Sequence, residues 1–137
     1  MRRSGKRTRT MRQKWRMVRM NERLRYLRYE KGGFFKAHTD GFYENEETGQ
    51  RTFQTVQFYL PSDPSGSPES FEAAGGGSTR FWGRLGDYAD VEAIPGRVLV
   101  FQHDDLWHTG ETVKSGVKCT IRSDILYERV GSPEVVN

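Results

Sequence analysis

Residues 24–127 form a succession of short β-type runs, and this pattern limits the folds that the chain can adopt. The clearest run is 52–60, in which β-branched and aromatic residues dominate until Pro61 ends it. Seven or eight strands at such close spacing, with almost no helical periodicity, favour an antiparallel sandwich or jelly roll over a parallel α/β sheet. The predicted strands are 24–29, 34–39, 52–60, 78–82, 87–94, 97–102 and 117–127.

The N-terminal segment has a different composition. Residues 1–29 hold 12 Lys/Arg and one Glu, a net charge of +11. Residues 30–137 hold 10 Lys/Arg and 17 Asp/Glu, a net charge of −7, so the net charge of the whole chain is +4. We expect disorder from residue 1 to about residue 12, because little there is apolar, and a short helix over 13–21. Such a basic arm can contact nucleic acid or an acidic partner, although its few aromatic residues do not favour nucleic acid.

Composition also bears on compartment. No apolar run approaches the ~20 residues that span a bilayer, and no signal-peptide pattern follows Met1. The single cysteine, Cys119, excludes an internal disulfide. We therefore expect an intracellular protein, cytoplasmic or nuclear, with no membrane span.

The triplet His38-Thr39-Asp40 is a candidate for metal binding. His38 and Asp40 are two residues apart, so on an extended strand their side chains point the same way. A second imidazole from a distant strand, at His108, would complete a 2-His-1-carboxylate triad, a ligand set that suits non-haem Fe(II) because it leaves coordination positions open. The sequence therefore predicts a metal site at His38, Asp40 and His108.

A lysine after the distal histidine is a candidate for binding an anionic ligand. Lys118 lies ten residues after His108, on the next predicted strand, past a stretch with glycines at 110 and 116. A cation near the metal but not bound to it is what a dicarboxylate cosubstrate needs for its far carboxylate. Two alternatives stay open: His103 can replace His108 as the distal ligand, and Arg122 can replace Lys118 as the carboxylate partner.

The chain resembles the prolyl 4-hydroxylase-type branch of the Fe(II)/2-oxoglutarate-dependent dioxygenases. The stretches that carry the resemblance stand in the family's order over roughly three-quarters of the chain. They are NERLRYLRYEKGGFFKAHTDG (21–41), TFQTVQFYL (52–60), GGGSTRF (75–81) and IPGRVLVFQHDDLWHTGETVKSGVKCTIRSDILY (94–127).

The resemblance implies a double-stranded β-helix with iron held by His38, Asp40 and His108. It implies that 2-oxoglutarate chelates the iron, and that its far carboxylate pairs with Lys118, helped by hydroxyl groups. The hydroxyls expected there are those of Tyr29 and of Tyr59 or Thr55, although a half-buried structural role for Tyr29 stays open.

The implied activity is that of an oxidoreductase. O₂ and 2-oxoglutarate would be cosubstrates, ascorbate the reductant, and the product a hydroxylated C–H bond, in a prolyl or other side chain of a protein or peptide. Two rival interpretations are a non-catalytic β-barrel binding module that uses its basic arm, and a zinc-binding cupin-like protein, since two His and one Asp also suit zinc.

The sequence departs from the family in three places. Phe35 stands where many relatives carry tyrosine, and Asp124 stands where some place a tryptophan that lines the substrate side. Family members usually have more structure before the 21–41 segment, so we expect a truncated N-terminal support. We expect a basic arm at 1–20, the dioxygenase domain at 21–130 and a tail at 131–137.

Overall fold

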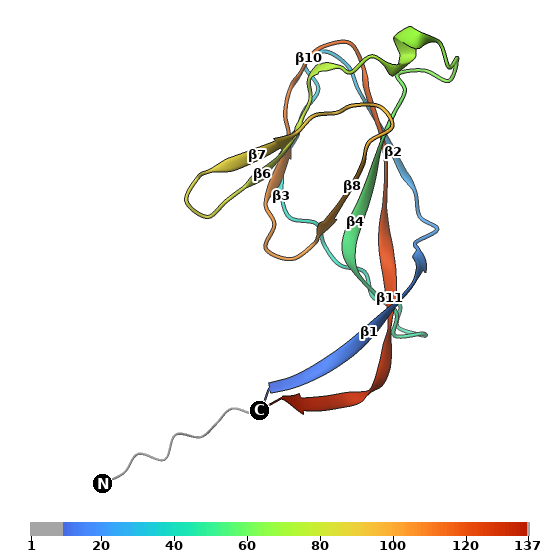
Figure 1. Cartoon of the computed structure of the whole chain (residues 1–137), viewed down its shortest axis with the longest axis vertical. Coiled ribbons are helices and arrows are strands. Elements are labelled where there is room, and N and C mark those ends of the chain that lie inside the picture. Colours follow the sequence, from blue (N-terminus) through green and yellow to red (C-terminus); the bar gives the residue numbers. More distant parts are fainter. Residues whose placement is uncertain (1–9, 137) are drawn as a thin grey trace.

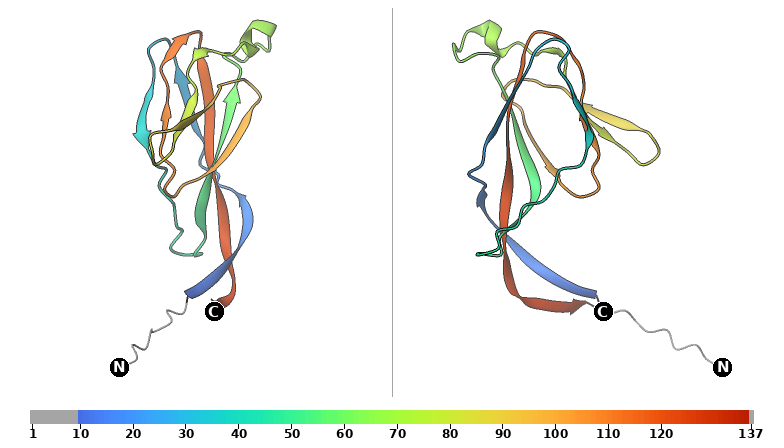
Figure 2. Two further views of the ribbon diagram at one scale, coloured as in Figure 1. Left: turned by 60° about the vertical axis from the view of Figure 1, so that its left-hand side comes forward. Right: turned by 180° about the vertical axis from the view of Figure 1, so that it is seen from behind.

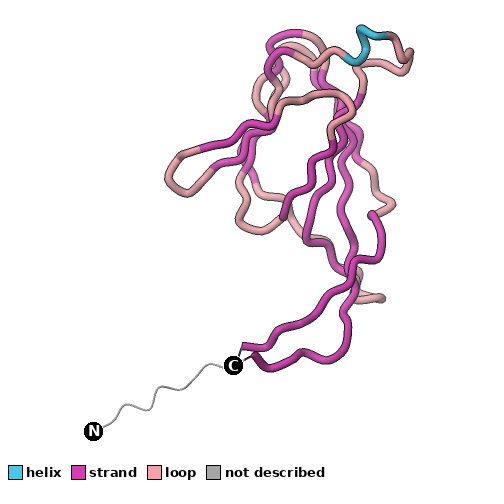
Figure 3. The backbone as a smooth tube through the Cα atoms, viewed as in Figure 1, coloured by secondary structure: helices cyan, strands magenta, loops and turns pink. Residues whose placement is uncertain are grey.

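The structure, a computed structural model, describes residues 10–136 and is built almost entirely of β-strands (Figure 1). Strand and loop alternate along the described part of the tube in Figure 3, and helix is confined there to one short turn. The elements are β1 (Thr10–Met20), β2 (Arg25–Tyr29), β3 (Phe35–His38), β4 (Arg51–Leu60), η1 (Pro68–Phe71), β5 (Gly75–Gly76), β6 (Thr79–Trp82), β7 (Tyr88–Val91), β8 (Val98–Gln102), β9 (His108–Gly110), β10 (Val113–Ser115) and β11 (Lys118–Val136).

The larger sheet is organised around β11. Its strand order is β1-β11-β4-β8, and β2 also pairs with β11, ahead of β1 on the same edge. All these pairs are antiparallel. Figure 2 shows β11 in both views as it runs from the body of the molecule into a long ribbon that it forms with β1.

The smaller sheet has the order β3-β9-β6-β7, and β10 and β5 form a separate ribbon. The two sheets meet through side chains on their inner faces. The rings of Phe81 on β6 and Phe101 on β8 lie 5.1 Å apart between centroids, and the hydroxyls of Tyr59 and Thr79 lie 2.7 Å apart. Two antiparallel sheets packed face to face confirm the predicted jelly roll.

The helix predicted for 13–21 is wrong, because β1 occupies this segment. Residues 10–20 pair with residues 125–136 of β11, and the Trp15 ring packs edge-on against Phe53 with centroids 4.9 Å apart. Strand pairing and this aromatic contact outweigh a weak helical pattern. The disorder predicted for 1–12 falls mainly on residues 1–9, outside the described residues, while residues 10–12 are part of β1.

Short elements within loops escaped the sequence pattern. The Pro/Ser/Gly-rich segment 61–77 contains the 3-10 helix η1, whose preceding Ser67 side chain accepts a hydrogen bond from the Ser70 amide. Further along, β5 pairs with β10. Elements of two to four residues carry too little periodicity to be detected from sequence.

The outer face of the larger sheet is apolar and exposed. Val98 and Val100 on β8 and Tyr26 on β2 point to this face and are 50%, 51% and 58% exposed. Within residues 10–136 no α-helix covers it. None of the helices among these residues is long and apolar enough to cross a membrane.

Replacing Trp15 tests how β1 is held. Trp15→Ala removes the contact with Phe53 and the stacking of Arg129, whose guanidinium carbon lies 5.4 Å from the Trp15 ring centroid. We expect a loss of about 1.5–3 kcal/mol in the free energy of opening β1, measured as faster amide hydrogen exchange in β1 than in β4. Met17→Ala, at a side chain 62% exposed, is the control and should change exchange little. Equal effects of the two substitutions would contradict this account.

Candidate metal centre

Three potential ligands meet between the two sheets. His38 ends β3, Asp40 follows two residues later, and His108 begins β9, where it stands opposite His38 in the strand register. Asp40 Oδ1 lies 3.4 Å from His38 Nε2 and 3.7 Å from His108 Nε2. The structure thus brings the three predicted residues together, with one ligand atom from each within 4.8 Å of the others.

Both imidazoles are oriented by backbone carbonyls. His38 Nδ1 lies 2.7 Å from the carbonyl oxygen of Lys36, and His108 Nδ1 lies 3.0 Å from that of Leu106. A carbonyl only accepts, so each Nδ1 donates its proton, and in the neutral ring Nε2 keeps a free lone pair. Fixing the tautomer in this way is typical of metal-binding histidines.

The Asp40 carboxylate is almost fully buried, with 1% of its side chain exposed. Thr55 Oγ1 donates a hydrogen bond to Asp40 Oδ2 at 2.5 Å, while Oδ1 accepts no hydrogen bond. Arg122 Nη2 lies 2.9 Å from Oδ1 as an ion pair without hydrogen-bond alignment. The oxygen that faces the two imidazoles therefore accepts no hydrogen bond and is held only by the charge of Arg122.

These residues fit a divalent metal ion. Cis ligands bonded at about 2.1 Å lie roughly 3 Å apart, so the observed distances need only small side-chain rotations to close on one ion. Two neutral nitrogens and one carboxylate oxygen are the donor set of non-haem Fe(II) and also suit zinc.

Aromatic rings surround the two imidazoles. The Phe35 ring lies 4.5 Å from the His38 ring, and the Phe101 ring 4.9 Å from the His108 ring, between centroids. Burial lowers the pKa of His108, and this outweighs the opposing effects of the Leu106 carbonyl and Asp40. His108 is therefore neutral at pH 7, the form that binds a metal.

Lys118 lies in the same cavity as the triad. It is only 6% exposed, and burial alone lowers its pKa to about 8, without a compensating carboxylate among the described residues. Its Nζ lies 5.1 Å from the centroid of the Tyr29 ring and 5.9 Å from that of Tyr59. A buried cation without a partner is costly, so this position suits an anionic ligand.

The hydroxyl groups predicted to assist Lys118 are placed differently from one another. Burial raises the pKa of Tyr29 and of Tyr59, so both hydroxyls carry their protons. The Tyr29 side chain lines the cavity, and the Tyr59 hydroxyl lies 2.7 Å from Thr79 Oγ1. Thr55 stands opposite Asp124, six residues and about 20 Å along β11 from Lys118. In this geometry the Thr55 hydroxyl supports Asp40 and does not lie beside Lys118.

The two alternative residues occupy other places. His103 Nε2 lies 3.2 Å from Asp124 Oδ1, and His103 does not join the cluster of His38, Asp40 and His108. Arg122 lines the same cavity as Lys118, but four residues and about 13 Å further along β11, where it contacts Asp40. The two cations thus share one strand face but lie beside different parts of the cavity.

Sequence reasoning missed several residues of the cavity wall. Thr79 Oγ1 lies 3.3 Å from Gln57 Nε2, and both side chains line the cavity. Gly110 lies beside Lys118, since a Cβ there would be 3.2 Å from Phe35 Cβ and 3.8 Å from Lys118 Nζ. A glycine inside a strand signals such a close approach, but the sequence does not say to what.

Comparison with known proteins agrees with this geometry. The sequence model of the family described as "2OG-Fe(II) oxygenase superfamily" matches residues 24–123, most of the chain. These residues include the triad and Lys118. No match was found among curated protein sequences.

Two solved structures share the fold. A prolyl-4-hydroxylase from Pseudomonas putida superposes with a TM-score of 0.53 at 18% identity, over 79% of this chain and 52% of that one. A viral collagen prolyl hydroxylase from Paramecium Bursaria Chlorella virus-1, a 2-oxoglutarate complex, also gives 0.53, at 21% identity over 87% of this chain and 62% of that one. The chain therefore spans between half and two thirds of the length of these structures.

Arg122→Gln tests the electrostatic balance at Asp40. The substitution leaves a buried carboxylate without its cation, so we expect the metal-free protein to lose about 1–3 kcal/mol of stability. Mn(II) should then raise Tm more in the variant than in the wild type, because the site is more negative. Arg28→Gln, on β2 and paired with the exposed Glu30, is the matched control. An unchanged Tm without metal, or a smaller shift with Mn(II), would argue against the ion pair.

Proposed function

We propose that this chain, which belongs to the 2OG-Fe(II) oxygenase superfamily, binds Fe(II) through His38, Asp40 and His108 and hydroxylates a C–H bond in a protein or peptide. Membership of the family supports a dioxygenase activity that uses iron and 2-oxoglutarate. The activity, the residue assignments and the peptide substrate are all parts of the proposal.

One observation carries the proposal. Two imidazoles, each held through Nδ1 by a backbone carbonyl, meet an oxygen of a buried aspartate that accepts no hydrogen bond. The same cavity holds a buried lysine without a carboxylate partner among residues 10–136. A metal triad alone suits several chemistries. An additional cation in the cavity, apart from the ligands, is what a metal-chelating dicarboxylate requires.

Each residue has a separate task in this arrangement. The Lys36 and Leu106 carbonyls hold the imidazole rings, and Thr55 holds the Asp40 carboxylate. Lys118 binds the far carboxylate of 2-oxoglutarate, with Tyr29 and Tyr59 beside it. Phe35 and Phe101 pack against the two imidazole rings. The chain thereby positions the reactants.

When bound, the iron and 2-oxoglutarate supply the oxidising chemistry. O₂ provides two oxygen atoms, one for the hydroxyl group of the product and one for the new carboxylate of succinate, and CO₂ leaves. The reaction consumes one 2-oxoglutarate for each C–H bond hydroxylated.

The two structural neighbours guide the choice of substrate. Both are prolyl hydroxylases by name, so a prolyl side chain is the first candidate, with other side chains next. Ascorbate as the reductant and an intracellular location belong to the same proposal.

Succinate formation tests the activity. With Fe(II), ascorbate and 2-oxoglutarate, we expect the wild type to release succinate, and His108→Ala to lose at least about 100-fold in rate because the iron loses one ligand. His103→Gln serves as the control, since His103 lies outside the triad. If the rate followed His103 rather than His108, the ligand assignment would be refuted.

The pH dependence of 2-oxoglutarate binding tests Lys118. Its pKa of about 8 means that the side chain is a cation at lower pH and becomes neutral as the pH rises through 8. We therefore expect constant affinity between pH 6.5 and 7.5, and a Kd that rises up to about tenfold per pH unit above pH 8 until the pKa of the complex is reached. That pKa will exceed 8, since a bound carboxylate stabilises the cation.

The measurement is titration calorimetry of 2-oxoglutarate into the Mn(II)-loaded protein between pH 6.5 and 10. Lys118→Met should bind weakly at every pH and show no such rise. A wild-type Kd that stays constant across this range, or a Lys118→Met Kd within twofold of the wild type, would exclude Lys118 as the carboxylate partner.

A further inference from the structure

A second cavity lies next to the metal centre. Its volume is about 530 Å³, and its wall includes Gly41, which directly follows Asp40, and Arg122, which also lines the cavity of the triad. We call it the arginine cleft, after three residues of its wall: Arg23, Arg25 and Arg122.

The arginines form an arrangement that the fold itself does not explain. Arg25 on β2 and Arg122 on β11 are direct partners in the strand register, so two like charges face each other across the pair. Like charges directly opposite each other on a sheet are destabilising, and Asp40 compensates Arg122 alone. Within residues 10–136, neither Arg23 nor Arg25 forms an ion pair, and Arg122 pairs only with Asp40.

The cleft offers little negative charge of its own. Asp124 is the single carboxylate in its wall, and Asp124 Oδ1 lies 3.2 Å from His103 Nε2. Arg23 and Arg25 are exposed, so a ligand can reach them from solvent. The cleft is therefore positively charged, open and next to the metal centre.

We propose that the arginine cleft binds the carboxylate of an Asp or Glu residue that neighbours the target residue in a peptide substrate. The inference rests on the proposed function and adds a substrate class to it. Guanidinium groups bind carboxylates through paired, charge-assisted hydrogen bonds. Arg122 Nη2 lies 2.9 Å from Asp40 Oδ1. A carboxylate bound by the arginines of the cleft therefore places the adjoining residues of the peptide close to the metal.

Among residues 10–136 the positive charges are too localised for a nucleic-acid track. On β1, Lys14 pairs with Glu134, Arg16 with Glu128 and Arg19 with Glu22. A polynucleotide is bound by a row of free cations along its phosphates, whereas three of the four cations of this strand are already paired.

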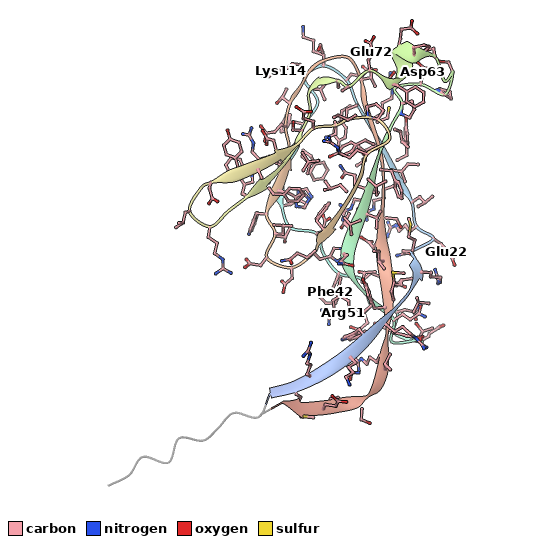
Figure 4. All side chains as sticks on the ribbon, in the orientation of Figure 1. Glu22, Phe42, Arg51, Asp63, Glu72 and Lys114 are labelled. Carbon is pink, nitrogen blue, oxygen red and sulfur yellow. The ribbon has the colours of Figure 1, made fainter. Side chains whose placement is uncertain are left out.

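One of the two aromatic side chains in the wall of the cleft, Phe42, is also stacked on a cation. The Arg51 guanidinium carbon lies 3.9 Å from the centroid of the Phe42 ring, and Figure 4 shows the two residues together below β4. This stacking covers one face of the ring that a base would otherwise use. Both features favour a short acidic peptide.

Three peptide pools test the inference. Each has a randomised central residue, and the flanking residues are Glu in the acidic pool, Gln in the neutral pool and Lys in the basic pool. Binding of fluorescein-labelled pools is measured by polarisation with the Mn(II)- and 2-oxoglutarate-loaded protein. Succinate release and a 16 Da mass gain are then measured with Fe(II). The variants are Arg25→Gln and Arg25→Glu, with Arg28→Gln as the control on the opposite face of β2.

We expect the acidic pool to bind about tenfold or more tightly than the neutral pool. Arg25→Gln should reduce this ratio to less than about threefold, Arg25→Glu should favour the basic pool, and Arg28→Gln should keep the preference of the wild type. Equal affinity for all pools, or a preference that survives Arg25→Glu, overturns the inference, while succinate release from any pool still upholds the proposed function.

Failure of the proposed function alone gives a different combination of results. An Arg25-dependent preference for the acidic pool, without Fe(II)-dependent succinate release, upholds the cleft as a carboxylate site and refutes the proposed function. A single-stranded oligonucleotide that displaces the acidic pool at lower concentration, and loses affinity in Arg25→Gln, overturns the peptide assignment in favour of nucleic acid.

Discussion

The pairing of β3 with β9 is the interaction on which the candidate site depends. It sets His38 opposite His108 across the two strands, and the extended backbone after His38 turns Asp40 to the same side. Side chains alternate along a strand, so a slip of one residue in this pairing would send one imidazole to the other face. The rings of Phe81 and Phe101 join the two sheets around this pair and resist such a slip.

The electrostatics of the site follow from one face of β11. Lys118 and Arg122 both point inward from this strand, four residues apart. Arg122 already contacts the buried aspartate, whereas Lys118 has no carboxylate partner among the described residues and its pKa is lowered. One strand face thus supplies two cations with different surroundings. We assign Arg122 to the metal and the substrate, and Lys118 to the cosubstrate.

Part of the candidate site was predictable because it depends on spacing along the sequence. The alternation of side chains placed His38 with Asp40, and the distance from His108 selected Lys118. The register in which the strands pair could not be predicted from the sequence. The contact of Thr55 with Asp40 and the pairing of Arg25 with Arg122 both depend on which residues face each other across β2, β4 and β11. Likewise, β1 becomes a strand through its partner β11 rather than through its own pattern.

The central claim is that one cation is held by three named atoms. The most direct test is the anomalous difference density of Mn(II) in crystals grown with 2-oxoglutarate. The account predicts a single strong peak within bonding distance of His38 Nε2, His108 Nε2 and Asp40 Oδ1, with the far carboxylate of 2-oxoglutarate directed at Lys118. A peak at His103 and Asp124, or a metal bound by only one of the two proposed imidazoles, would contradict it.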